Sequence, residues 1–367
     1  MADLPRVAYT VLQSWHRVPG GTATSALRLG EALVATGEID LVGVGPRGAP
    51  PPAPWTPSFP VRRLPLPYPA VYEVWHRWRR LPVQRATGAV DLVHATAPTV
   101  PPAGGAPLVV TVHDVFPLTD PERFTPRGVR LLTRGLELAR DEAALVLCPS
   151  QATADECAAH GFDRATLRVV PWGVSVRRPE DARIDAALRR HGLRAGGYLL
   201  AVGTVEPRKN LRTLIAAVAR TARADVPLAV VGPDGWNEDL EPVVAAAGER
   251  VRRLGFVSDD DLAALEAGAL ALCVPSLREG FGMSVLDAMS LGTPVVTSTD
   301  VALREVAGDA GLAVEALDVD GWVAALDELV GDDDRRRELG RRGVARATHR
   351  TWAATASATL AAYRELW

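Results

Sequence analysis

The sequence lacks several features that mark particular classes of protein. It has only three cysteines in 367 residues, none of them in the CxxC spacing of a redox or zinc motif, which fits a reduced compartment. Its apolar runs all fall short of the roughly 18–20 residues that span a membrane. The first residues, MADLPRVAYTVLQ, also lack the charged segment and apolar block of a signal peptide. We therefore expect a cytoplasmic protein that keeps Cys148 and Cys273 in its core.

Neither sign of charge dominates the chain. The 41 Lys and Arg residues nearly balance the 44 Asp and Glu residues, for a net charge of −3, so there is no basic surplus to indicate a nucleic-acid partner. Hydrophobic residues make up 47% of the sequence, as in globular proteins. The length exceeds that of one ordinary core and suits two domains of about 170 residues each.

Short runs rich in β-branched residues alternate with longer amphipathic stretches along most of the chain. Runs that are apolar at every position are typical of parallel strands buried on both faces, and the alternation predicts βαβ units. One intervening stretch, residues 22–37, has a helical pattern and closes with a glycine. We predict an α/β protein with two sheets of about six strands each. The twelve expected strands lie at 6–12, 40–45, 91–96, 107–114, 144–150, 166–174, 198–203, 227–232, 250–256, 271–275, 294–298 and 312–314.

A charged, strand-free segment at 174–197 predicts the boundary between the two domains. The Pro-rich segment 46–60 predicts an extended surface loop or lid within the first domain. The last stretch, 351–367, is amphipathic and has no strand after it. We expect it to form a terminal helix that packs across the two domains and buries three aromatic residues, Trp352, Tyr363 and Trp367.

One motif match is rejected. GVGPRG at 43–48 satisfies G-x-G-x-x-G and follows a predicted strand. A dinucleotide site needs a helix directly afterwards, because the helix amides bind the pyrophosphate. The sequence continues instead with APPPAP, which cannot open such a helix.

Two cations stand where a predicted strand of the second half ends. Arg208 and Lys209 follow the run AVGTVEP, and open α/β sheets bind ligands beyond the carboxyl ends of their strands. Arg offers a planar fork and Lys a point charge, and the pair suits a diphosphate. A solvated charged turn is the alternative interpretation of these two residues alone.

The stretch EGFGMSVLD at 279–287 also follows a predicted strand and opens a predicted helix. Its glycines allow close backbone approach, and the first amides of the helix, from about Gly282 to Ser284, form an anion site. Glu279 would repel a phosphate and is better suited to accept hydrogen bonds from sugar hydroxyls. Asp287, about five residues into the helix, can do the same for a ribose. Acids for hydroxyls, with cations and amides for a diphosphate, predict a nucleotide-sugar site.

These motifs together resemble those of the retaining glycosyltransferases of family 4, and most of all its mannosyltransferase-like members. The resemblance covers roughly residues 1–330 and is most specific in the second half. It rests on PSLREGFGMSVLDAMSLGTPVVTS (275–298), VGTVEPRKNL (202–211), VVPWGV (169–174), VTVHDVFPLTDPERF (110–124) and LREVAGDAGLAV (303–314).

The resemblance implies the GT-B fold, in which two Rossmann-like domains face each other across a cleft. Residues 1–174 would form the acceptor-binding domain and residues 175–350 the nucleotide-sugar-binding domain. Residues 351–367 would form a helix that crosses back to the N-terminal domain. The activity implied is transfer of a hexose from a nucleotide diphosphate sugar to an acceptor hydroxyl of a glycan, glycolipid or natural product, with retention.

By position, the resemblance implies that Arg208 and Lys209 bind the donor diphosphate. It implies that Glu279 binds the sugar hydroxyls near the anomeric carbon. Asp287 stands where the family usually has a second Glu, the ribose ligand, and it is shorter by about one methylene, ~1.5 Å. A direct contact with ribose therefore needs a closer helix or a bridging water. The same resemblance lets the backbone of Phe281, Gly282 and Met283 approach the sugar and phosphates, with Ser284 beside the diphosphate. We expect Phe256 and Val257 to meet the donor base.

In the first half, the resemblance assigns the donor phosphate to the amides of Gly20 and Gly21, just before the predicted helix. It turns His113, at a predicted strand end, toward the transferred sugar, although a lone histidine there is more often structural. Asp114 could orient His113 or cap the following segment. Ser150 matches a family position, yet we expect it to act as a helix N-cap.

In this family the leaving diphosphate itself is thought to take the acceptor proton, and we find no second catalytic carboxylate in the sequence. Stabilisation of the departing charge then falls on Arg208, Lys209 and the helix N-terminus. The resemblance implies that no donor-bound metal and no cofactor are needed, and no DxD motif between apolar flanks stands out. The acidic runs at 259–261 and 332–334 look like helix starts and surface residues.

The stretch 68–86 bears on the unknown acceptor, which could be a lipid-linked glycan, an oligosaccharide or a small molecule. It places Val71, Val74, Trp75 and Trp78 at helical spacing beside several arginines. A basic amphipathic helix with Trp can lie on an anionic membrane, which would make the protein peripheral at the inner face of the membrane. An ordinary packed helix with a solvated basic face is the alternative.

Several functions fit the sequence. The PRKN turn and the HD segment favour GDP-mannose, while UDP- and dTDP-sugars stay open as donors. A catalytically silent nucleotide-sugar-binding subunit and a sugar-nucleotide epimerase are the alternatives outside sugar transfer.

Overall fold

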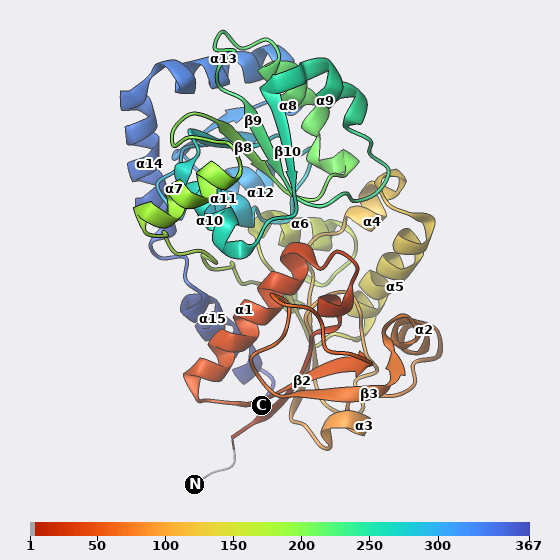
Figure 1. The fold of residues 1–367 in the computed structure, drawn as a ribbon. Coiled ribbons are helices and arrows are strands. Elements are labelled where there is room, and N and C mark those ends of the chain that lie inside the picture. The colour runs from red at the N-terminus through yellow and green to blue at the C-terminus, as the bar shows by residue number, and fades with distance from the viewer. Residues whose placement is uncertain (1–3) are drawn as a thin grey trace. The chain divides into compact units, whose positions relative to one another are not determined.

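The computed structural model describes residues 4–367, and the chain divides into two compact units. Unit 1 consists of the chain up to Gly173 together with the C-terminal segment Thr351–Trp367, and unit 2 is Val174–Arg350. The division falls one residue before the predicted boundary. Residues 1–3 of the expected first domain lie outside the described residues. Figure 1 traces the chain from red to blue, and the last helix, in dark blue, belongs to unit 1 with the red and yellow elements.

Unit 1 is built on a seven-stranded parallel sheet in the order β3-β2-β1-β4-β5-β6-β7. Successive strands are added outward on either side of β1, so the order reverses between β1 and β4. The strands are β1 (Arg6–Thr10), β2 (Asp40–Arg47), β3 (Val61–Pro67), β4 (Leu92–Ala95), β5 (Leu108–Thr111), β6 (Leu145–Cys148) and β7 (Leu167–Val169).

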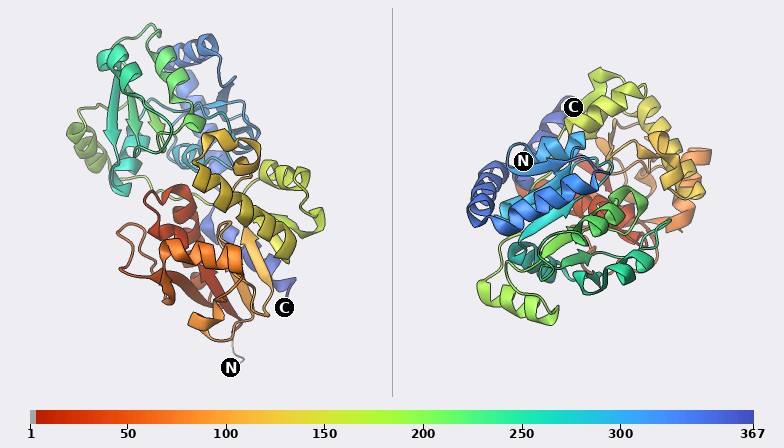
Figure 2. Two further views of the ribbon diagram at one scale, coloured as in Figure 1. Left: turned by 90° about the vertical axis from the view of Figure 1, so that its right-hand side faces the viewer. Right: turned by 90° about the horizontal axis from the view of Figure 1, so that it is seen from above.

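Helices cover both faces of this sheet, because neighbouring strand residues point to opposite sides. Val7 and Tyr9 pack with Leu33 of α1 and Leu360 of α15, whereas Ala8 packs with the α2 and α5 side chains. Figure 2 shows these helices on the ribbon from two further directions. The helical elements are η1 (Leu12–Trp15), α1 (Gly20–Thr36), α2 (Tyr68–Trp78), α3 (Gln84–Thr87), α4 (Phe116–Thr119), η2 (Pro121–Arg123), α5 (Pro126–Glu142), α6 (Gln151–Ala159), η3 (Arg164–Thr166) and α15 (Trp352–Arg364).

The terminal helix α15 packs on α1 of unit 1. Its Tyr363 is fully buried, and the hydroxyl lies 2.6 Å from Nδ1 of His94 in β4. The prediction that Trp367 is buried is wrong, since 45% of the residue is exposed. The reason is local: α15 ends at Arg364, so Trp367 no longer follows the helical register that turns Tyr363 inward.

The strand β3 was not predicted, and unit 1 therefore has seven strands where six were expected. Two prolines within VRRLPLP argue against a strand in the middle of a sheet. The segment is tolerated because β3 lies at the sheet edge, where a missing N–H costs no ladder hydrogen bond. The Pro-rich segment before it is not a free lid throughout, because β2 takes residues to Arg47 and Phe59 is buried in the core.

The stretch 68–86 does not form the single helix that its pattern predicts. Helix α2 ends at Trp78, and α3 begins only at Gln84. Arg79 and Leu81 adopt positive φ values of 48° and 65°, which interrupts the helix before Pro82. Two of the four expected membrane-facing residues, Val71 and Trp75, are fully buried in the core of unit 1. The membrane-facing stripe is thereby reduced mainly to Trp78, which is 58% exposed.

Unit 2 has a six-stranded parallel sheet in the order β10-β9-β8-β11-β12-β13. The order reverses between β8 and β11, as in a doubly wound sheet. The predicted α/β class with two Rossmann-like parts is confirmed. The strands are β8 (Leu199–Val202), β9 (Leu228–Val231), β10 (Val251–Gly255), β11 (Ala271–Val274), β12 (Val295–Ser298) and β13 (Gly311–Val314).

The core of unit 2 joins the sheet to its helices. Buried Leu199, Val230 and Cys273 pack with α8 and α13, and Trp322 of α13 is fully buried among them. Both predicted acidic helix starts are confirmed, since Ser258 caps α10 and Asp332 caps α14 through side-chain acceptors. The helical elements are α7 (Asp181–Arg190), η4 (Pro207–Lys209), α8 (Leu211–Val218), α9 (Glu241–Ala247), η5 (Gly248–Arg250), α10 (Asp259–Gly268), α11 (Met283–Ser290), α12 (Val301–Ala307), α13 (Val319–Gly331) and α14 (Asp333–Ala347).

Two expectations from composition are met. The cysteines Cys148, Cys157 and Cys273 are buried and form no disulfide. Among residues 4–367, no helix combines the length and the apolar character needed to cross a membrane.

Candidate functional site

The site of unit 2 lies where its sheet order reverses. The loop after β8 carries Arg208 and Lys209, and the loop after β11 carries Ser276 and Glu279. These strands are neighbours and parallel, so both loops leave the same edge of the sheet. The sequence separates the two loops by about 70 residues, and the fold brings them into hydrogen-bond contact.

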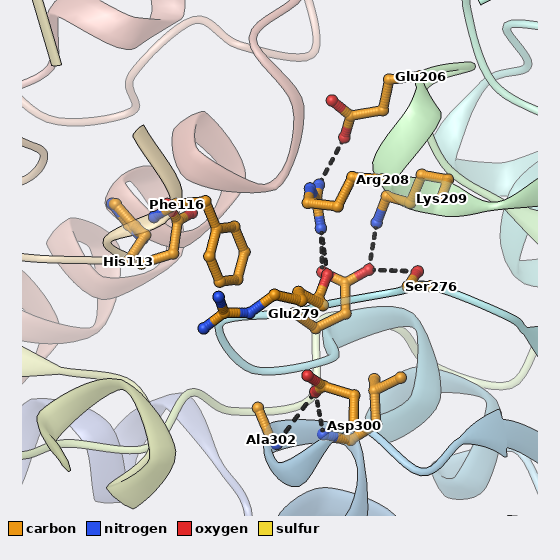
Figure 3. A network of polar contacts seen from close by, with 12 residues as sticks. His113, Phe116, Glu206, Arg208, Lys209, Ser276, Glu279, Asp300 and Ala302 are labelled. Carbon is orange, nitrogen blue, oxygen red and sulfur yellow. Dashed lines mark hydrogen bonds and ion pairs between the residues drawn. The ribbon is translucent and has the colours of Figure 1, made fainter. Parts of the chain in front are cut away.

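Glu279 is the centre of a polar network in unit 2 (Figure 3). Its Oε1 accepts hydrogen bonds from Lys209 Nζ at 2.6 Å and from the Ser276 hydroxyl at 2.7 Å. Its Oε2 accepts from an Arg208 guanidinium nitrogen at 2.8 Å. The predicted acid and the two predicted cations are thus brought together as one cluster.

Glu206 holds the other side of the Arg208 guanidinium. The Nη2 atom of Arg208 donates to Glu206 Oε1 at 2.5 Å, while Nη1 also donates to the carbonyl of Arg278 at 2.9 Å. Glu206 is buried, with 5% of the residue exposed. Because both ends of the guanidinium fork are bonded, its plane is fixed in one orientation.

The charges of this cluster keep Glu279 ionised. Burial alone would raise the pKa of Glu279, but the positive charges of Arg208 and Lys209 lower the pKa to about 2. Asp300 behaves in the opposite way. Burial, together with the negative charge of Glu279, raises the pKa of its carboxyl. Asp300 also caps α12, accepting from the amides of Ala302 and Leu303 at 3.0 and 3.1 Å (Figure 3).

Two glycines make room for this arrangement. A Cβ on Gly203 would lie 3.2 Å from Cε of Lys209, so the lysine stem lies against bare backbone after β8. Gly282 has φ +116°, a conformation that favours glycine, and a Cβ there would lie 2.9 Å from the side chain of Leu303.

Asn210 fixes the turn that carries both cations. Its Nδ2 donates to the carbonyls of Pro275 and Ala316 at 3.0 and 2.7 Å, and its own φ is +51°. The amide of Leu277 in turn donates to the carbonyl of Arg208 at 2.8 Å. The cation turn and the loop after β11 are therefore joined by backbone and side-chain bonds on both sides of the network.

Helix α11 begins at Met283, with Gly282 as its N-cap residue. No side chain caps this end, so the first amides of α11, near Ser284, are the unbonded donors that attract anions. Phe281, two residues before α11, is buried, with 3% of the residue exposed.

Asp287 is 8% exposed and is the fifth residue of α11. Its Oδ1 accepts a hydrogen bond from the backbone amide of Ser175 at 2.7 Å. Ser175 is the second residue of unit 2, so the segment that enters the unit bonds one oxygen of the residue predicted to bind ribose. Near Asp287 lies Glu266, which is fully buried and whose Oε2 has no hydrogen-bond partner in the described structure. Burial, reinforced by the Asp287 charge, raises the pKa of Glu266 well above its usual value.

The residues predicted to meet the donor base follow β10. Phe256 is 57% exposed, and Val257 is nearly buried. They lie in the turn before Ser258, the N-cap of α10.

The predicted residues of unit 1 lie beyond or at the carboxyl ends of its strands. Gly20 and Gly21 do not precede a helix at Thr22 as predicted, because they are the first two residues of α1. Their amides still belong to the unbonded first turn. Ser150 acts as the predicted N-cap, accepting from the amide of Thr153 at 3.0 Å. Asp114 takes the capping alternative, since its Oδ1 accepts from the amide of Phe116 at 3.2 Å.

His113 lies two residues beyond the end of β5, and not at the strand end as predicted. Its Nε2 lies 2.8 Å from the carbonyl of Thr96 and must carry the proton to donate there. Burial lowers the pKa of His113 to about 4, so the ring is neutral at pH 7 and Nδ1 is an acceptor. Nδ1 is buried and has no partner among the described residues.

Several site residues were missed from the sequence. No local sequence pattern marks these residues, because their contacts form only when loops distant in the sequence come together in the fold. They are Glu206, Asn210, Ser276 and Asp300. The sequence contains one signal that was overlooked. Lys209 is the only lysine in the chain, and the other 40 of its 41 Lys and Arg residues are Arg. A chain that uses Arg at every other place keeps a compact ammonium at this one.

Comparisons with known proteins agree with this geometry. Residues 19–178 match the family model described as Glycosyltransferase Family 4, and residues 196–332 match Glycosyl transferases group 1. An Escherichia coli relative, O-antigen chain mannosyltransferase B, is 35% identical over 268 residues, which are 70% of each chain. The MMP alpha-(1->4)-mannosyltransferase of Mycolicibacterium hassiacum is 31% identical over 71% of this chain and 66% of its own.

Solved structures share the fold at lower identity. The Anabaena HepE complex with UDP and glucose has a TM-score of 0.77 at 17% identity, covering 99% of this chain and 100% of that one. Sucrose-phosphate synthase from Thermosynechococcus elongatus has a TM-score of 0.78 at 22% identity, covering 99% of both chains.

Proposed function

Because the chain belongs to glycosyltransferase family 4, has the GT-B fold and is a glycosyltransferase that uses nucleotide sugars, we propose that it transfers a hexose from GDP-mannose, with retention, to an acceptor hydroxyl. The observation that carries the proposal is the cluster of Arg208 and Lys209 around Glu279, next to the uncapped start of α11. Two cations and free helix amides suit a diphosphate.

Each part of the donor is assigned to the residues whose chemistry suits it. The diphosphate takes Arg208, Lys209 and the amides from Gly282 to Ser284. Glu279, ionised well below neutral pH, accepts hydroxyls of the sugar. Asp287, whose Oδ1 also accepts from the amide of Ser175, takes the ribose. The base lies against Phe256 and Val257.

The chemistry is electrostatic. As the bond between the anomeric carbon and the diphosphate oxygen breaks, negative charge grows on the leaving group. Arg208 is held at both ends of its fork before this happens, so no reorganisation is needed at the moment of reaction. The diphosphate itself accepts the acceptor proton. In unit 1, the amides of Gly20 and Gly21 serve the phosphate and Nδ1 of His113 accepts from a hydroxyl of the transferred sugar.

We propose further that the reaction requires no metal ion and no cofactor. Among the described residues, no group of three or more His, Cys, Asp or Glu side chains could hold a metal ion, and the charge of the diphosphate is met by Arg208 and Lys209. Unchanged transfer in the presence of excess chelator is the expected result.

Mannose is favoured because two relatives of more than 30% identity are named as mannosyltransferases. A UDP- or dTDP-sugar is the second candidate, since the similar HepE structure is described with UDP and glucose.

For the location, we propose the cytoplasm, with peripheral membrane contact through the exposed Trp78 and the neighbouring Arg77 and Arg80. Loss of vesicle binding in Trp78→Ala would support that contact.

The test of the donor is thermal stabilisation by GDP, UDP, ADP and dTDP, followed by transfer from the matching sugar nucleotide. One nucleotide at about 100 times its Kd should stabilise the protein by about 2.7 kcal/mol. Stabilisation by none of them would contradict the proposal. Stabilisation without transfer would indicate a silent nucleotide-sugar-binding subunit, and a C2-epimerised product would indicate an epimerase.

A further inference from the structure

Three aromatic side chains of unit 1 meet beyond the carboxyl ends of its strands. His16 follows η1, directly after β1, while Tyr68 and Tyr72 lie on the first turns of α2, directly after β3. The His16 ring centroid lies 4.9 Å from that of Tyr68 and 6.1 Å from that of Tyr72, and the two tyrosines are 5.2 Å apart. These three residues are called the His16 cluster below.

The hydroxyl of Tyr72 ties the cluster together. It lies 2.7 Å from Nε2 of His16, and the side chain of Thr99, which follows β4, is close enough to lower the pKa of this hydroxyl. The cluster therefore joins the loops after β1, β3 and β4. The sheet order reverses between β1 and β4, and ligands of open α/β sheets bind beyond the strand ends at such a reversal.

Packing alone does not explain the cluster. Tyr72 is buried at 6% exposure, but His16 and Tyr68 are only half-buried. Ser14, two residues before His16, is 1% exposed, and its hydroxyl has no hydrogen-bond partner among residues 4–367. A buried hydroxyl without a partner is costly in a folded protein, so this part of the structure is not optimised for packing alone.

The cluster carries no charge at neutral pH. Burial lowers the pKa of His16 to about 4 and raises the pKa values of Tyr68 and Tyr72, so all three rings are neutral. The site offers hydroxyls, ring nitrogens and apolar ring faces. A neutral ligand with many hydroxyls on its edge and C–H groups on its face, as in a pyranose, matches both kinds of surface.

We propose that the His16 cluster binds a neutral pyranose ring of the acceptor, which makes the acceptor a saccharide. The inference rests on the proposed sugar transfer and deepens it, because it names the acceptor class. Tyr68 supplies the stacking face, and His16 and Tyr72 supply hydrogen bonds to the ring substituents.

The test measures saccharide binding by saturation-transfer-difference NMR on the full chain in the presence of GDP. The probes are methyl α-mannoside, α-linked mannobioses, methyl α-glucoside and lactose, and the anionic probe is inositol phosphate. Tyr68→Ala should weaken binding of at least one saccharide about tenfold or more, while Tyr68→Phe keeps the ring and should bind within about twofold of the wild type.

Trp78→Ala is the matched control, since Trp78 is an exposed aromatic residue on the same helix. It should leave saccharide binding unchanged. If Tyr68→Ala does not fold, as judged by circular dichroism, Tyr68→Leu keeps the bulk and removes only the aromatic face, with the same expectation.

The inference is overturned if no saccharide of the panel binds, or if Tyr68→Ala and Tyr68→Leu bind saccharide as the wild type does. It is also overturned if only inositol phosphate binds and Arg127→Ala abolishes that binding, because Arg127 is the cation that acts on Tyr68. Nucleotide stabilisation is recorded in every sample. Its absence would contradict the proposed function, whereas its presence without saccharide binding contradicts the acceptor alone.

Discussion

The Nζ atom of Lys209 lies 2.6 Å from Oε1 of Glu279, and Arg208 bonds the other oxygen of the same carboxylate. One carboxylate thus bonds both cations. Under the proposed function a donor would have to share or displace these bonds, which would link sugar recognition by Glu279 to phosphate recognition by Arg208 and Lys209.

Replacing Glu279 by Gln should separate these two roles. The neutral amide releases Lys209 and Arg208, so the Kd for GDP should stay the same or fall. Sugar transfer should drop about 100-fold, as when a group that acts in the transition state is removed. Calorimetry with GDP and a transfer assay measure the two effects, and a parallel loss of both would argue against the division of roles.

The acid stability of the protein should also depend on Glu279. Its pKa of about 2 in the folded protein lies below the usual 4.5, so its contribution to stability is present above pH 4.5 and is lost as the pH falls toward 2. The shift corresponds to roughly 3 kcal/mol at most. Tm measured from pH 3 to 7 should fall less steeply on acidification in Glu279→Gln than in the wild type.

Lys209 should tolerate no replacement fully. Lys209→Ala should lower kcat/KM about 100-fold or more, and Lys209→Arg should restore only part of the loss, because a planar fork does not reproduce a point charge on the bare backbone of Gly203. Steady-state kinetics provide the measurement. Arg212→Ala, which removes a half-exposed cation paired with Glu238 nearby, is the control and should keep near-normal activity.

The buried Glu266 should make unit 2 less stable at high pH. Its raised pKa means that the folded protein holds a proton that the unfolded chain releases near pH 4.5, so unfolding free energy falls as the pH rises from there through the folded pKa. Glu266→Gln should raise Tm at pH 8 and flatten the dependence on pH. Glu249→Gln, an exposed position, should change neither, and equal pH profiles for Glu266→Gln and the wild type would contradict the prediction.

The short acid at position 287 provides a test of ribose binding. Asp287→Glu should keep or improve the Kd for the nucleotide, whereas Asp287→Ala should weaken it. Asp287→Ala should also lower Tm, because the amide of Ser175 loses its acceptor. Equal nucleotide affinity in all three proteins would show that Asp287 has no role in ribose binding.

Twelve of the strands were predictable because most of them are short apolar runs bounded by polar residues. The exception, β3, contains two prolines and has one buried residue among half-buried and exposed ones, so only its place at the sheet edge makes it a strand. The break between α2 and α3 was hidden for a related reason. The arginines there favour a helix, and the left-handed turn at Arg79 is a tertiary effect.

The site was predictable to the extent that its residues lie in one loop each. The motifs predicted that Arg208, Lys209 and Glu279 belong to one site, but as phosphate and sugar ligands and not as partners of each other. Glu206, Ser276 and Asp300 depend on contacts that form only when loops after different strands meet. The use of an Asp287 oxygen by Ser175 could not be foreseen either, because 112 residues separate the pair.

Because Lys209 is the only lysine in the sequence, an isotope label on the lysine side chain reports on this site alone. Reductive methylation with ¹³C-formaldehyde labels amines, so in this chain it marks Nζ of Lys209 and the amino terminus. The NMR signal of a dimethylated Lys209 would follow the exchange of Glu279 for a phosphate directly. No mutation is needed to make the label specific, which allows donor and acceptor binding to be observed on the unaltered sequence.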